Sequence, residues 1–387
     1  MTKVGIDKIG LYIPKYYVEM TELAQERGIE PEKLTIGIGQ DRMAVPTIRE
    51  DIVTMGANAA RQILSEEDKQ QIDQIIFATE SGFDFSKSAA TYIHELLGIQ
   101  PFAKSYEIKQ ACYGATAGLQ SACDYVRLRP ERKVLVIASD IAKYGLNTPG
   151  EPTQGAGAVA LLVSANPRVL ALALESVSYT DNQYDFWRPS YSPVALVDGK
   201  FSTELYQQCF TKVLNQVPLT TQQQLSAMVF HLPFSKMGKK ALEAYAAVAS
   251  EQLEETLSNW QANYADSILL GREVGNIYTG SLYLSLISLL WHTQTLSAGD
   301  QIGLFSYGSG AVAECLVGEL QPTFRAQIQQ TQLEALLSRR VKLTIAEYEA
   351  VFSQVLSTDG DTLELSDIYE PDGVVLARLD AHRRYYQ

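Results

Sequence analysis

Cysteine is scarce in this chain of 387 residues. The four cysteines, at positions 112, 123, 209 and 315, form no CxxC pair and show no metal-ligand spacing. Scattered cysteines of this kind are typical of a reducing compartment. Basic residues are also in deficit, because 32 Lys and Arg stand against 45 Asp and Glu. The net charge of -13 argues against a broad basic surface for nucleic acid, although a local basic cluster could still hold a small anion. We therefore expect no metal and no nucleic-acid partner.

Long apolar runs are missing as well. The most apolar stretch, from Ile277 to Leu290, is interrupted by Thr, Gly and Ser and is shorter than the roughly 20 residues that a membrane span needs. The N-terminus, beginning Met-Thr-Lys-Val, lacks the layout of a signal peptide. The nucleotide-binding pattern GxGxxG is absent too. We expect a soluble, cytoplasmic protein with no membrane contact, in which residues 277–290 form a buried helix.

The chain does contain the same order of elements twice. The first half is expected to have strands at 4–13, 72–79, 133–140 and 154–163, with helices at 20–27, 51–64 and from 112. The second half is expected to have strands at 225–230, 301–306 and 308–317, with helices at 241–257 and from 276. This repetition indicates an internal duplication, and strands alternating with helices indicate an α/β fold of mixed sheets covered by helices. We place the halves at 1–166 and 167–387, with an irregular insertion at 175–216 and a polar, helical C-terminal tail.

Cys112 stands where extended sequence changes into a run of small residues, Gly114-Ala-Thr-Ala-Gly. Such a run is tolerable in a helix that packs closely against other backbone. A thiol in the first turn of that helix would have its pKa lowered by the positive end of the helix dipole. The alternative is that Cys112 is a small buried hydrophobe.

The duplication pairs Glu80 with His231, each just after a core strand, and Cys112 with Asn276, each at the head of a small-residue helix. We expect these four side chains to converge. These residue types suit acyl transfer combined with carbon–carbon bond formation. A thiol can carry an acyl group, a carboxyl can act as acid and base, and hydrogen-bond donors can stabilise a developing oxyanion. Taken singly, Glu80 could only favour a helix start and His231 could be a core histidine.

Basic and glycine-rich segments lie near these residues. Lys236, Lys239 and Lys240 follow His231 and would suit an anionic carrier such as coenzyme A, although a solvated charge run remains an alternative. The repeated glycine segments at Gly155 and Gly308 are expected to supply tight turns and backbone N–H groups near a reacting carbonyl.

Several segments together resemble the bacterial hydroxymethylglutaryl-CoA synthases of the thiolase superfamily. They are Gly37-Ile-Gly-Gln-Asp-Arg-Met-Ala-Val, Thr79-Glu-Ser, Glu107-Ile-Lys-Gln-Ala-Cys-Tyr-Gly-Ala-Thr-Ala-Gly, Asp140-Ile-Ala-Lys-Tyr-Gly, Gly150-Glu-Pro-Thr-Gln-Gly-Ala-Gly-Ala-Val, Tyr184-Asp-Phe-Trp-Arg-Pro, His231-Leu-Pro-Phe-Ser-Lys-Met-Gly-Lys-Lys and Gly275-Asn-Ile-Tyr-Thr-Gly-Ser. The resemblance covers nearly the whole chain. Two departures are visible, the bulky Phe85 and the segment 192–195, which ends at Ala195.

The resemblance implies a layered αβαβα fold, a homodimer, and condensation of acetyl-CoA with acetoacetyl-CoA followed by hydrolysis, with no cofactor beyond these thioesters. It assigns acetyl transfer to Cys112, acid–base catalysis to Glu80 and positioning of acetoacetyl-CoA to His231. It assigns substrate contacts to these residues: Asn276, Tyr144, Thr153, Ser309, Lys236 and Lys240. A β-branching synthase that takes its acceptor on a carrier protein, and a non-catalytic scaffold of the same fold, remain alternatives.

Overall fold

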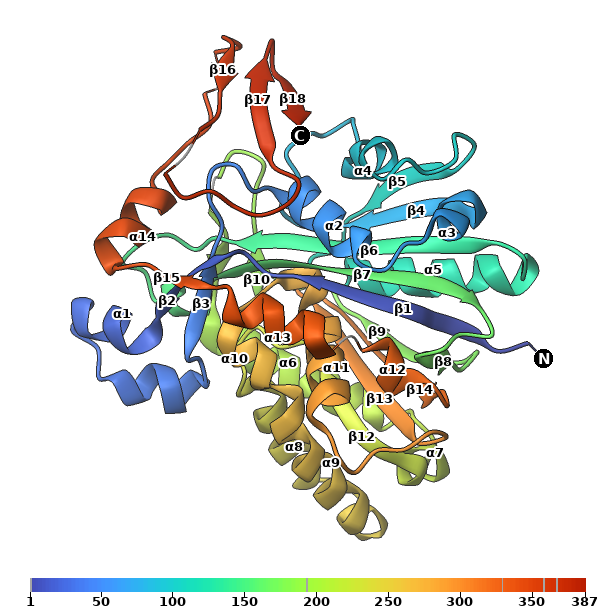
Figure 1. Cartoon of the computed structure of the whole chain (residues 1–387). Helices are drawn as coiled ribbons and strands as arrows, with labels where there is room; N and C mark the ends of the chain where they lie inside the picture. The colour runs from blue at the N-terminus through green and yellow to red at the C-terminus, as the bar shows by residue number, and fades with distance from the viewer. Residues whose placement is uncertain (1, 193, 329, 358, 367) are drawn as a thin grey trace.

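A large mixed β-sheet organises the molecule (Figure 1). The structure is a computed structural model and describes residues 2–192, 194–328, 330–357, 359–366 and 368–387. The strands of this sheet are β1 (Val4–Tyr12), β4 (Ile72–Ala78), β5 (Lys104–Ile108), β6 (Lys133–Ala142), β7 (Gly155–Ala165), β8 (Leu170–Leu172), β9 (Val177–Thr180), β12 (Leu225–Phe230), β13 (Gln301–Gly308) and β14 (Val312–Leu320). The small sheets are formed by β2 (Tyr16–Glu19), β3 (Arg42–Val45), β10 (Phe186–Trp187), β11 (Leu196–Val197), β15 (Val341–Lys342), β16 (Leu363–Glu364), β17 (Leu376–Asp380) and β18 (Arg383–Tyr386).

Helices lie on the outer faces of the sheet and between its two halves. They are α1 (Met20–Glu26), α2 (Ile52–Arg61), α3 (Glu66–Gln71), α4 (Ala89–Leu97), α5 (Gly114–Leu128), α6 (Gly199–Leu214), α7 (Leu219–Gln224), α8 (Met237–Ala246), α9 (Glu254–Ser267), α10 (Leu269–Val274), α11 (Ser281–His292), α12 (Phe324–Gln327), α13 (Gln330–Ser338) and α14 (Ile345–Phe352). Short single turns are η1 (Lys33–Ile38), η2 (Glu151–Thr153), η3 (Glu251–Leu253) and η4 (Tyr278–Gly280). Within the described ranges, none of these helices is long and apolar enough to cross a membrane.

The strand order repeats the duplication seen in the sequence. The N-terminal part of the sheet runs β1-β7-β6-β4-β5 and the C-terminal part runs β8-β14-β13-β12, joined by the antiparallel pair β1 and β8. In each part the strand next to the junction, β7 or β14, is antiparallel to both neighbours. Farther from the junction, β6 is parallel to β4 and β13 is parallel to β12. The expected mixture of parallel and antiparallel strands is therefore confirmed.

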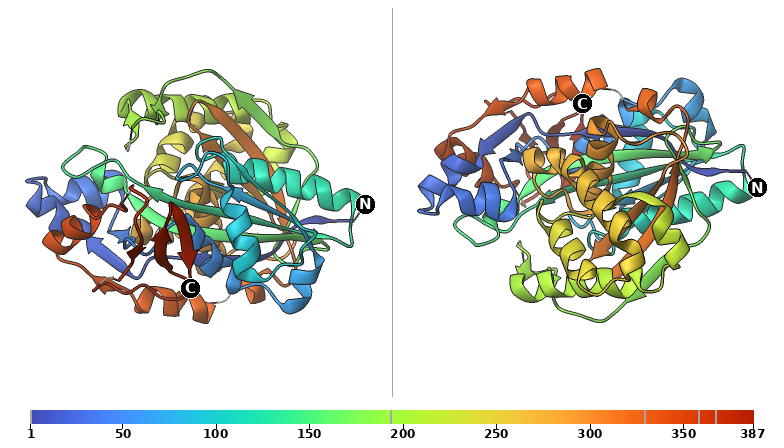
Figure 2. Two further views of the ribbon diagram at one scale, coloured as in Figure 1. Left: turned by 90° about the horizontal axis from the view of Figure 1, so that it is seen from above. Right: turned by 90° about the horizontal axis from the view of Figure 1, so that it is seen from below.

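Alternating side chains divide each half-sheet between two core layers. In β6, Val134 and Val136 belong to the inner core, whereas Leu135 and Ile137 belong to the outer core with α2 and α4. In the second half, side chains of β12 and β13 alternate in the same way: some lie in the inner core, and the others lie in an outer core with α6, α8 and α9. Successive residues of a strand point to opposite faces, so each half-sheet is buried on both sides. The gold helices of the outer layer are seen from below in Figure 2.

Helices α5 and α11 form the central layer between the half-sheets, and side chains of both lie in the inner core. Every residue from Ser281 to Leu290 is buried, which confirms the predicted buried helix in this apolar stretch. The layers are thus helix, sheet, paired helices, sheet and helix, the predicted αβαβα arrangement.

Three local predictions are wrong. The helix expected at 241–257 is two helices, α8 and α9, because the chain turns after Ala246 and Ser250 caps the next turn through Gln252 N. The supposedly irregular insertion contains the long helix α6. The tail is not wholly helical, since its last strands form a sheet that packs beside α2, where Tyr386 donates to the helix N-cap Asp51 at 2.8 Å.

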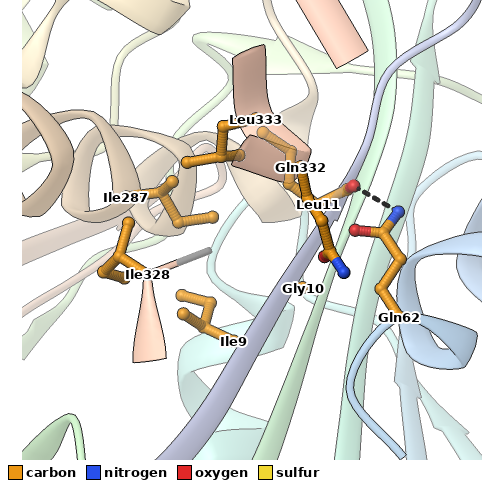
Figure 3. A pocket seen from close by; sticks show the side chains of 8 residues that line it. All are labelled: Ile9, Gly10, Leu11, Gln62, Ile287, Ile328, Gln332 and Leu333. Carbon is orange, nitrogen blue, oxygen red and sulfur yellow. Dashed lines mark hydrogen bonds between the residues drawn. The ribbon is translucent and has the colours of Figure 1, made fainter. Parts of the chain in front are cut away.

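Helix α13 of the tail packs closely against β1. Figure 3 shows Gln332 and Leu333 of α13 near Leu11 of β1, whose carbonyl accepts from Gln62 Nε2 at the end of α2 at 2.8 Å. The cavity among these side chains has a volume of about 10 Å³. This is room for one water molecule at most, so the tail covers β1 as a close-packed layer.

Candidate active site

The predicted site residues follow the carboxyl ends of parallel strands. Glu80 comes after β4, Cys112 after β5 and Tyr144 after β6, while His231 and Ser309 come after β12 and β13. The carboxyl ends of parallel strands meet at one edge of a sheet, which is where α/β folds gather their ligands. The topology therefore explains how residues from distant parts of the chain reach one region.

Cys112 and Glu80 are in direct contact. The thiol Sγ donates a hydrogen bond to Glu80 Oε1 at 3.0 Å. Cys112 lies in a tight turn before α5, not in its first turn as predicted, since the helix begins at Gly114 and the preceding Ala111 has a φ of 43°. The two residue types needed for acyl transfer and proton transfer therefore share one hydrogen bond.

The surroundings raise the pKa of both groups. Burial is the main cause of the increase at Cys112, and the charge of Glu80 and the hydrogen bond to it add to the effect. The prediction that a helix end lowers this pKa is therefore wrong, because desolvation and a neighbouring carboxyl disfavour a thiolate. Burial also raises the pKa of Glu80, and the nearby Asp140 contributes. Both shifts favour the neutral, protonated form of each group, so the carboxyl of Glu80 can act as an acid as well as a base.

Asp140, to which the sequence pattern assigns no role, fixes the backbone around Glu80. Its Oδ1 accepts from Thr79 Oγ1 at 2.8 Å, Glu80 N at 2.9 Å, Ser81 N at 3.0 Å and Ser81 Oγ at 2.8 Å. Its Oδ2 accepts from the N–H and the hydroxyl of Thr279, in the second half. One buried carboxylate therefore ties the Glu80 segment to η4. The signal in the sequence was a charged residue near the end of an otherwise apolar strand.

The second half contributes a neutral imidazole. His231 is buried, and burial lowers its pKa to about 3. Its backbone carbonyl accepts from Tyr206 Oη at 2.6 Å, while its Nδ1 finds no hydrogen-bond partner within the described part of the chain. A neutral imidazole can donate one N–H to a substrate oxygen without bringing a charge.

Asn276 and Tyr144 meet across the two halves. Asn276 Nδ2 donates to Tyr144 Oη at 3.3 Å, and its Oδ1 accepts from Tyr278 N and Ser281 Oγ, both at 2.9 Å. The Tyr144 ring packs edge-on against Tyr278 and Phe186. No hydrogen bond within the described residues links His231 to this pair or to Cys112.

Gly155 and Gly308, at matching positions in the two halves, each pack against the backbone of the other half. A Cβ on Gly155 would lie 2.7 Å from Asn276 O, and a Cβ on Gly308 would lie 2.7 Å from Gln110 O and Tyr113 N. Any side chain at either glycine would clash with backbone, so the first half closes on the Asn276 segment and the second on the Cys112 turn. Ser309 follows directly, and its carbonyl accepts from Gln110 Nε2 at 3.4 Å. Thr153 ends η2, where its hydroxyl donates to Gly150 O at 2.8 Å.

Part of the expected insertion reaches the site. Asp185 Oδ2 accepts from Tyr307 Oη at 2.8 Å and its Oδ1 accepts from Gly310 N at 3.0 Å, beside Ser309. Arg188 donates to the backbone carbonyl of Glu80. The sequence indicates an aromatic turn here, but its pattern assigns no role to either charged residue. Among the described side chains, no group of three His, Cys, Asp or Glu is placed to hold a metal ion.

Known proteins resemble this chain along most of its length. The family model for the N-terminal part of hydroxymethylglutaryl-coenzyme A synthase matches residues 1–168, and the model for the C-terminal part matches residues 247–360. A hydroxymethylglutaryl-CoA synthase of Enterococcus faecalis is 55% identical over 365 residues, covering 93% of this chain and 94% of the relative. The chain belongs to the hydroxymethylglutaryl-CoA synthase family.

Two further relatives show the range of this family. A solved HMG-CoA synthase complexed with CoA has a TM-score of 0.94, with 42% identity over 99% of both chains. A polyketide biosynthesis 3-hydroxy-3-methylglutaryl-ACP synthase of Bacillus subtilis is 33% identical, covering 91% of this chain and 88% of the relative. The predicted family and thiolase-like fold are confirmed, whereas the domain boundaries and the roles of single residues stay predictions.

The lysines expected to meet coenzyme A surround the start of α8. Lys236 is half-buried as the N-cap residue, and its backbone N–H donates to Ile38 O at 3.1 Å. Lys239 is exposed and forms an ion pair with Glu243 at 3.8 Å. Lys240 is also exposed, and its Nζ lies 5.3 Å from the centre of the Phe234 ring.

The two departures from the family pattern lie outside this group. Phe85 is 94% exposed in the loop that follows Glu80, so it packs on nothing in this chain. The segment 192–195 lies between β10 and β11, and residue 193 is outside the described residues. Neither departure contacts Cys112, Glu80 or His231 through a hydrogen bond in the part of the chain that is described.

Proposed function

We propose that this protein condenses acetyl-CoA with acetoacetyl-CoA and hydrolyses the product from the enzyme to give 3-hydroxy-3-methylglutaryl-CoA. The observation that supports this most directly is the 3.0 Å hydrogen bond between the Cys112 thiol and Glu80, in a chain of this family. The proposal includes no cofactor beyond the two CoA thioesters, because each step needs only a nucleophile and proton transfer. The product suits the mevalonate route, and the predicted cytoplasmic location stays a prediction.

The first step is acetyl transfer to Cys112. The Cys112 thiol gives up its proton, and the sulfur attacks the acetyl carbonyl as the bond to the CoA sulfur breaks. The leaving thiolate of CoA takes up a proton. Exchange of one thioester for another changes bond energy little, so this step is reversible.

Condensation and hydrolysis follow, and Glu80 acts in the condensation. The Glu80 carboxylate removes a proton from the acetyl methyl group, and the resulting carbon nucleophile attacks the ketone carbon of acetoacetyl-CoA. The ketone oxygen becomes a hydroxyl by accepting a proton, while a neutral His231 donates a hydrogen bond to it. Water then attacks the thioester carbonyl at Cys112, which restores the thiol and leaves a carboxylate.

Acetyl-CoA alone is expected to label Cys112. Incubation followed by peptide mass spectrometry should find one acetyl group, and Cys112→Ala should abolish it. The other cysteines serve as internal controls, because Cys123, Cys209 and Cys315 are buried. An acetyl group on any of these three would contradict the assignment of the nucleophile.

A carrier-protein enzyme is the second candidate, favoured by the 33% identical relative whose name specifies an ACP-bound product. We favour free acetoacetyl-CoA, since exposed lysines near His231 offer charge to the anionic end of coenzyme A. The net charge of -13 would repel an acidic carrier at long range. Consumption of carrier-bound acetoacetyl groups alone would reverse this preference.

Lys240→Ala is expected to raise KM for acetoacetyl-CoA about three- to tenfold while leaving kcat nearly unchanged, as an exposed charge contact contributes to binding equally in ground and transition states. Lys239→Ala is the comparison variant: it removes the same charge from a neighbouring lysine that is already paired with Glu243, so it should raise KM less. Steady-state kinetics measures both. Equal KM values in wild type and Lys240→Ala would show that Lys240 does not contribute to binding of acetoacetyl-CoA.

The protein is expected to be a homodimer. The apolar stretch around α11 cannot supply the interface, since it is buried within the chain. We propose the edge strand β5, which stands at one end of the strand order and presents a half-exposed Tyr106. The nearby Phe102 is also exposed. Unpaired strand edges with apolar side chains favour pairing with another chain.

Sedimentation at micromolar concentration tests this expectation, with Tyr106→Lys as the variant. The wild type should sediment as a dimer and the variant should shift toward monomer. A monomeric wild type would contradict the dimer, and a fully dimeric variant would exclude β5 from the interface.

A further inference from the structure

Tyr348 lies on α14 in the C-terminal tail, a segment to which the sequence reasoning gave no chemistry. In Figure 1, α14 lies beside α1, at the opposite end of the molecule from α5. The Tyr348 side chain is only 1% exposed, and its ring packs on Phe352 of the same helix. Its hydroxyl, however, points into the first half of the chain and takes part in two hydrogen bonds there.

The first of these bonds leads to the backbone at Tyr144. The Tyr348 hydroxyl accepts from Gln154 Nε2 at 2.9 Å. The other end of that amide, Gln154 Oε1, accepts from the backbone N–H groups of Tyr144 at 2.7 Å and Gly145 at 3.1 Å. Gln154 is buried, so each of its polar atoms depends on these partners.

The second bond leads to a buried ion pair. The Tyr348 hydroxyl donates to Glu151 Oε1 at 3.2 Å. Glu151 also accepts two hydrogen bonds from Arg27, which directly follows α1, at 2.9 and 3.0 Å, and one from Asn147 N at 2.9 Å. The hydroxyl therefore stands between two side chains that together hold three backbone N–H groups of residues 144–147.

The opposite side of Tyr144 faces the candidate active site. Its hydroxyl accepts from Asn276 Nδ2, and its ring packs against Tyr278 and Phe186. A side chain can keep such contacts only if its backbone is held in place. In this loop, which lies between β6 and η2, the holding groups are Gln154 and Glu151.

We propose that Tyr348 is a positioning residue, which orients Tyr144 toward the reacting groups through the Gln154 amide and the Glu151 carboxylate. The proposal rests on the proposed function for its kinetic consequence. A phenylalanine at this position would keep the ring contact with Phe352, yet it would leave Gln154 Nε2 without its acceptor and remove one donor from Glu151.

Tyr348→Phe is therefore expected to lower kcat/KM for the condensation about tenfold, as the net effect of one lost buried hydrogen bond. Tyr245→Phe is the matched control. Tyr245 is equally buried, and its hydroxyl donates to the side chain of Gln222 at 2.7 Å, within the outer core of the second half. Both variants should melt at a lower temperature than the wild type, but only Tyr348→Phe should lose activity.

A double-mutant cycle with Tyr144→Ala separates positioning from general destabilisation. If Tyr348 acts through Tyr144, Tyr348→Phe should change kcat/KM less than twofold in the Tyr144→Ala background. A further tenfold loss there, or an equal loss in Tyr245→Phe, would overturn the proposal.

Hydrogen–deuterium exchange gives a readout that needs no reaction. The amides of residues 144–147 should exchange faster in Tyr348→Phe than in the wild type, and at the wild-type rate in Tyr245→Phe. Unchanged exchange in Tyr348→Phe would overturn the proposed positioning. A wild-type protein that consumed neither thioester would instead overturn the proposed function, and the exchange result would still decide the role of Tyr348.

Discussion

Glu80→Ala is expected to accept an acetyl group on Cys112 and yet to form almost no condensation product. Loss of a positioned acid–base group lowers a rate by about 10² to 10⁴. Acetyl transfer should survive, because the thiol then loses the neighbour that helps raise its pKa and becomes easier to ionise. Peptide mass spectrometry measures the first step, and a product assay with both thioesters measures the second.

The isosteric variant Glu80→Gln is the control for shape. Its amide oxygen can still accept from the Cys112 thiol, but the amide cannot exchange protons with the acetyl methyl group. Both variants should therefore accept the acetyl group on Cys112 but form almost no condensation product. Condensation at near-native speed in either variant would contradict the role of Glu80. Failure of both variants to accept the acetyl group would show that Glu80 acts in the first step.

Asp140→Asn is expected to disrupt both stability and the ionisation of Glu80. The native carboxylate accepts hydrogen bonds from six donors. In the variant an amide NH₂ group replaces one carboxylate oxygen, and because it is itself a donor it cannot accept from the donors around it. Buried donors left without an acceptor cost about 1–3 kcal/mol each, so the free energy of unfolding should fall by about 3 kcal/mol. The charge of Asp140 also helps to raise the pKa of Glu80, so its removal should lower that pKa.

Removal of the Asp140 charge should shift the pH profile of the reaction toward acid. A lower pKa for Glu80 means that its carboxylate exists at lower pH, so the limb of the rate profile that reports this ionisation should move toward acid. Denaturant unfolding and the pH dependence of kcat/KM measure the two effects. Asp7→Asn is the matched control, because Asp7 is a buried carboxylate paired with Arg168 at 2.7 and 2.8 Å.

The control should lose stability without any shift of the pH profile. An Asp140→Asn protein with the wild-type profile would show that Asp140 is only a structural acceptor. A wild-type free energy of unfolding in the same variant would contradict the claim that its six donors depend on the carboxylate.

Prediction from the sequence succeeded where local pattern and long-range structure agree. The strands that end near Ala78 and Phe230 are short apolar runs buried on both faces, and such runs identify themselves by composition. It failed for α6 and for the strands β17 and β18, because their burial depends on which distant surface each segment covers. The same holds for the break between α8 and α9, which no glycine or proline marks in the sequence.

The sequence by itself determined the residue types and their places at the ends of strands: a thiol, a carboxyl, an imidazole and an amide in two matched halves. It also determined the family, because the resemblance extends along nearly the whole chain. Only the tertiary structure decided how these groups ionise. The pKa values of Cys112 and Glu80 rise because desolvation depends on everything packed around a group, and the neighbouring residues do not define those surroundings. The link from Tyr348 to Tyr144 was likewise decided by folding, since it joins residues about two hundred positions apart that only the packing of α14 brings together.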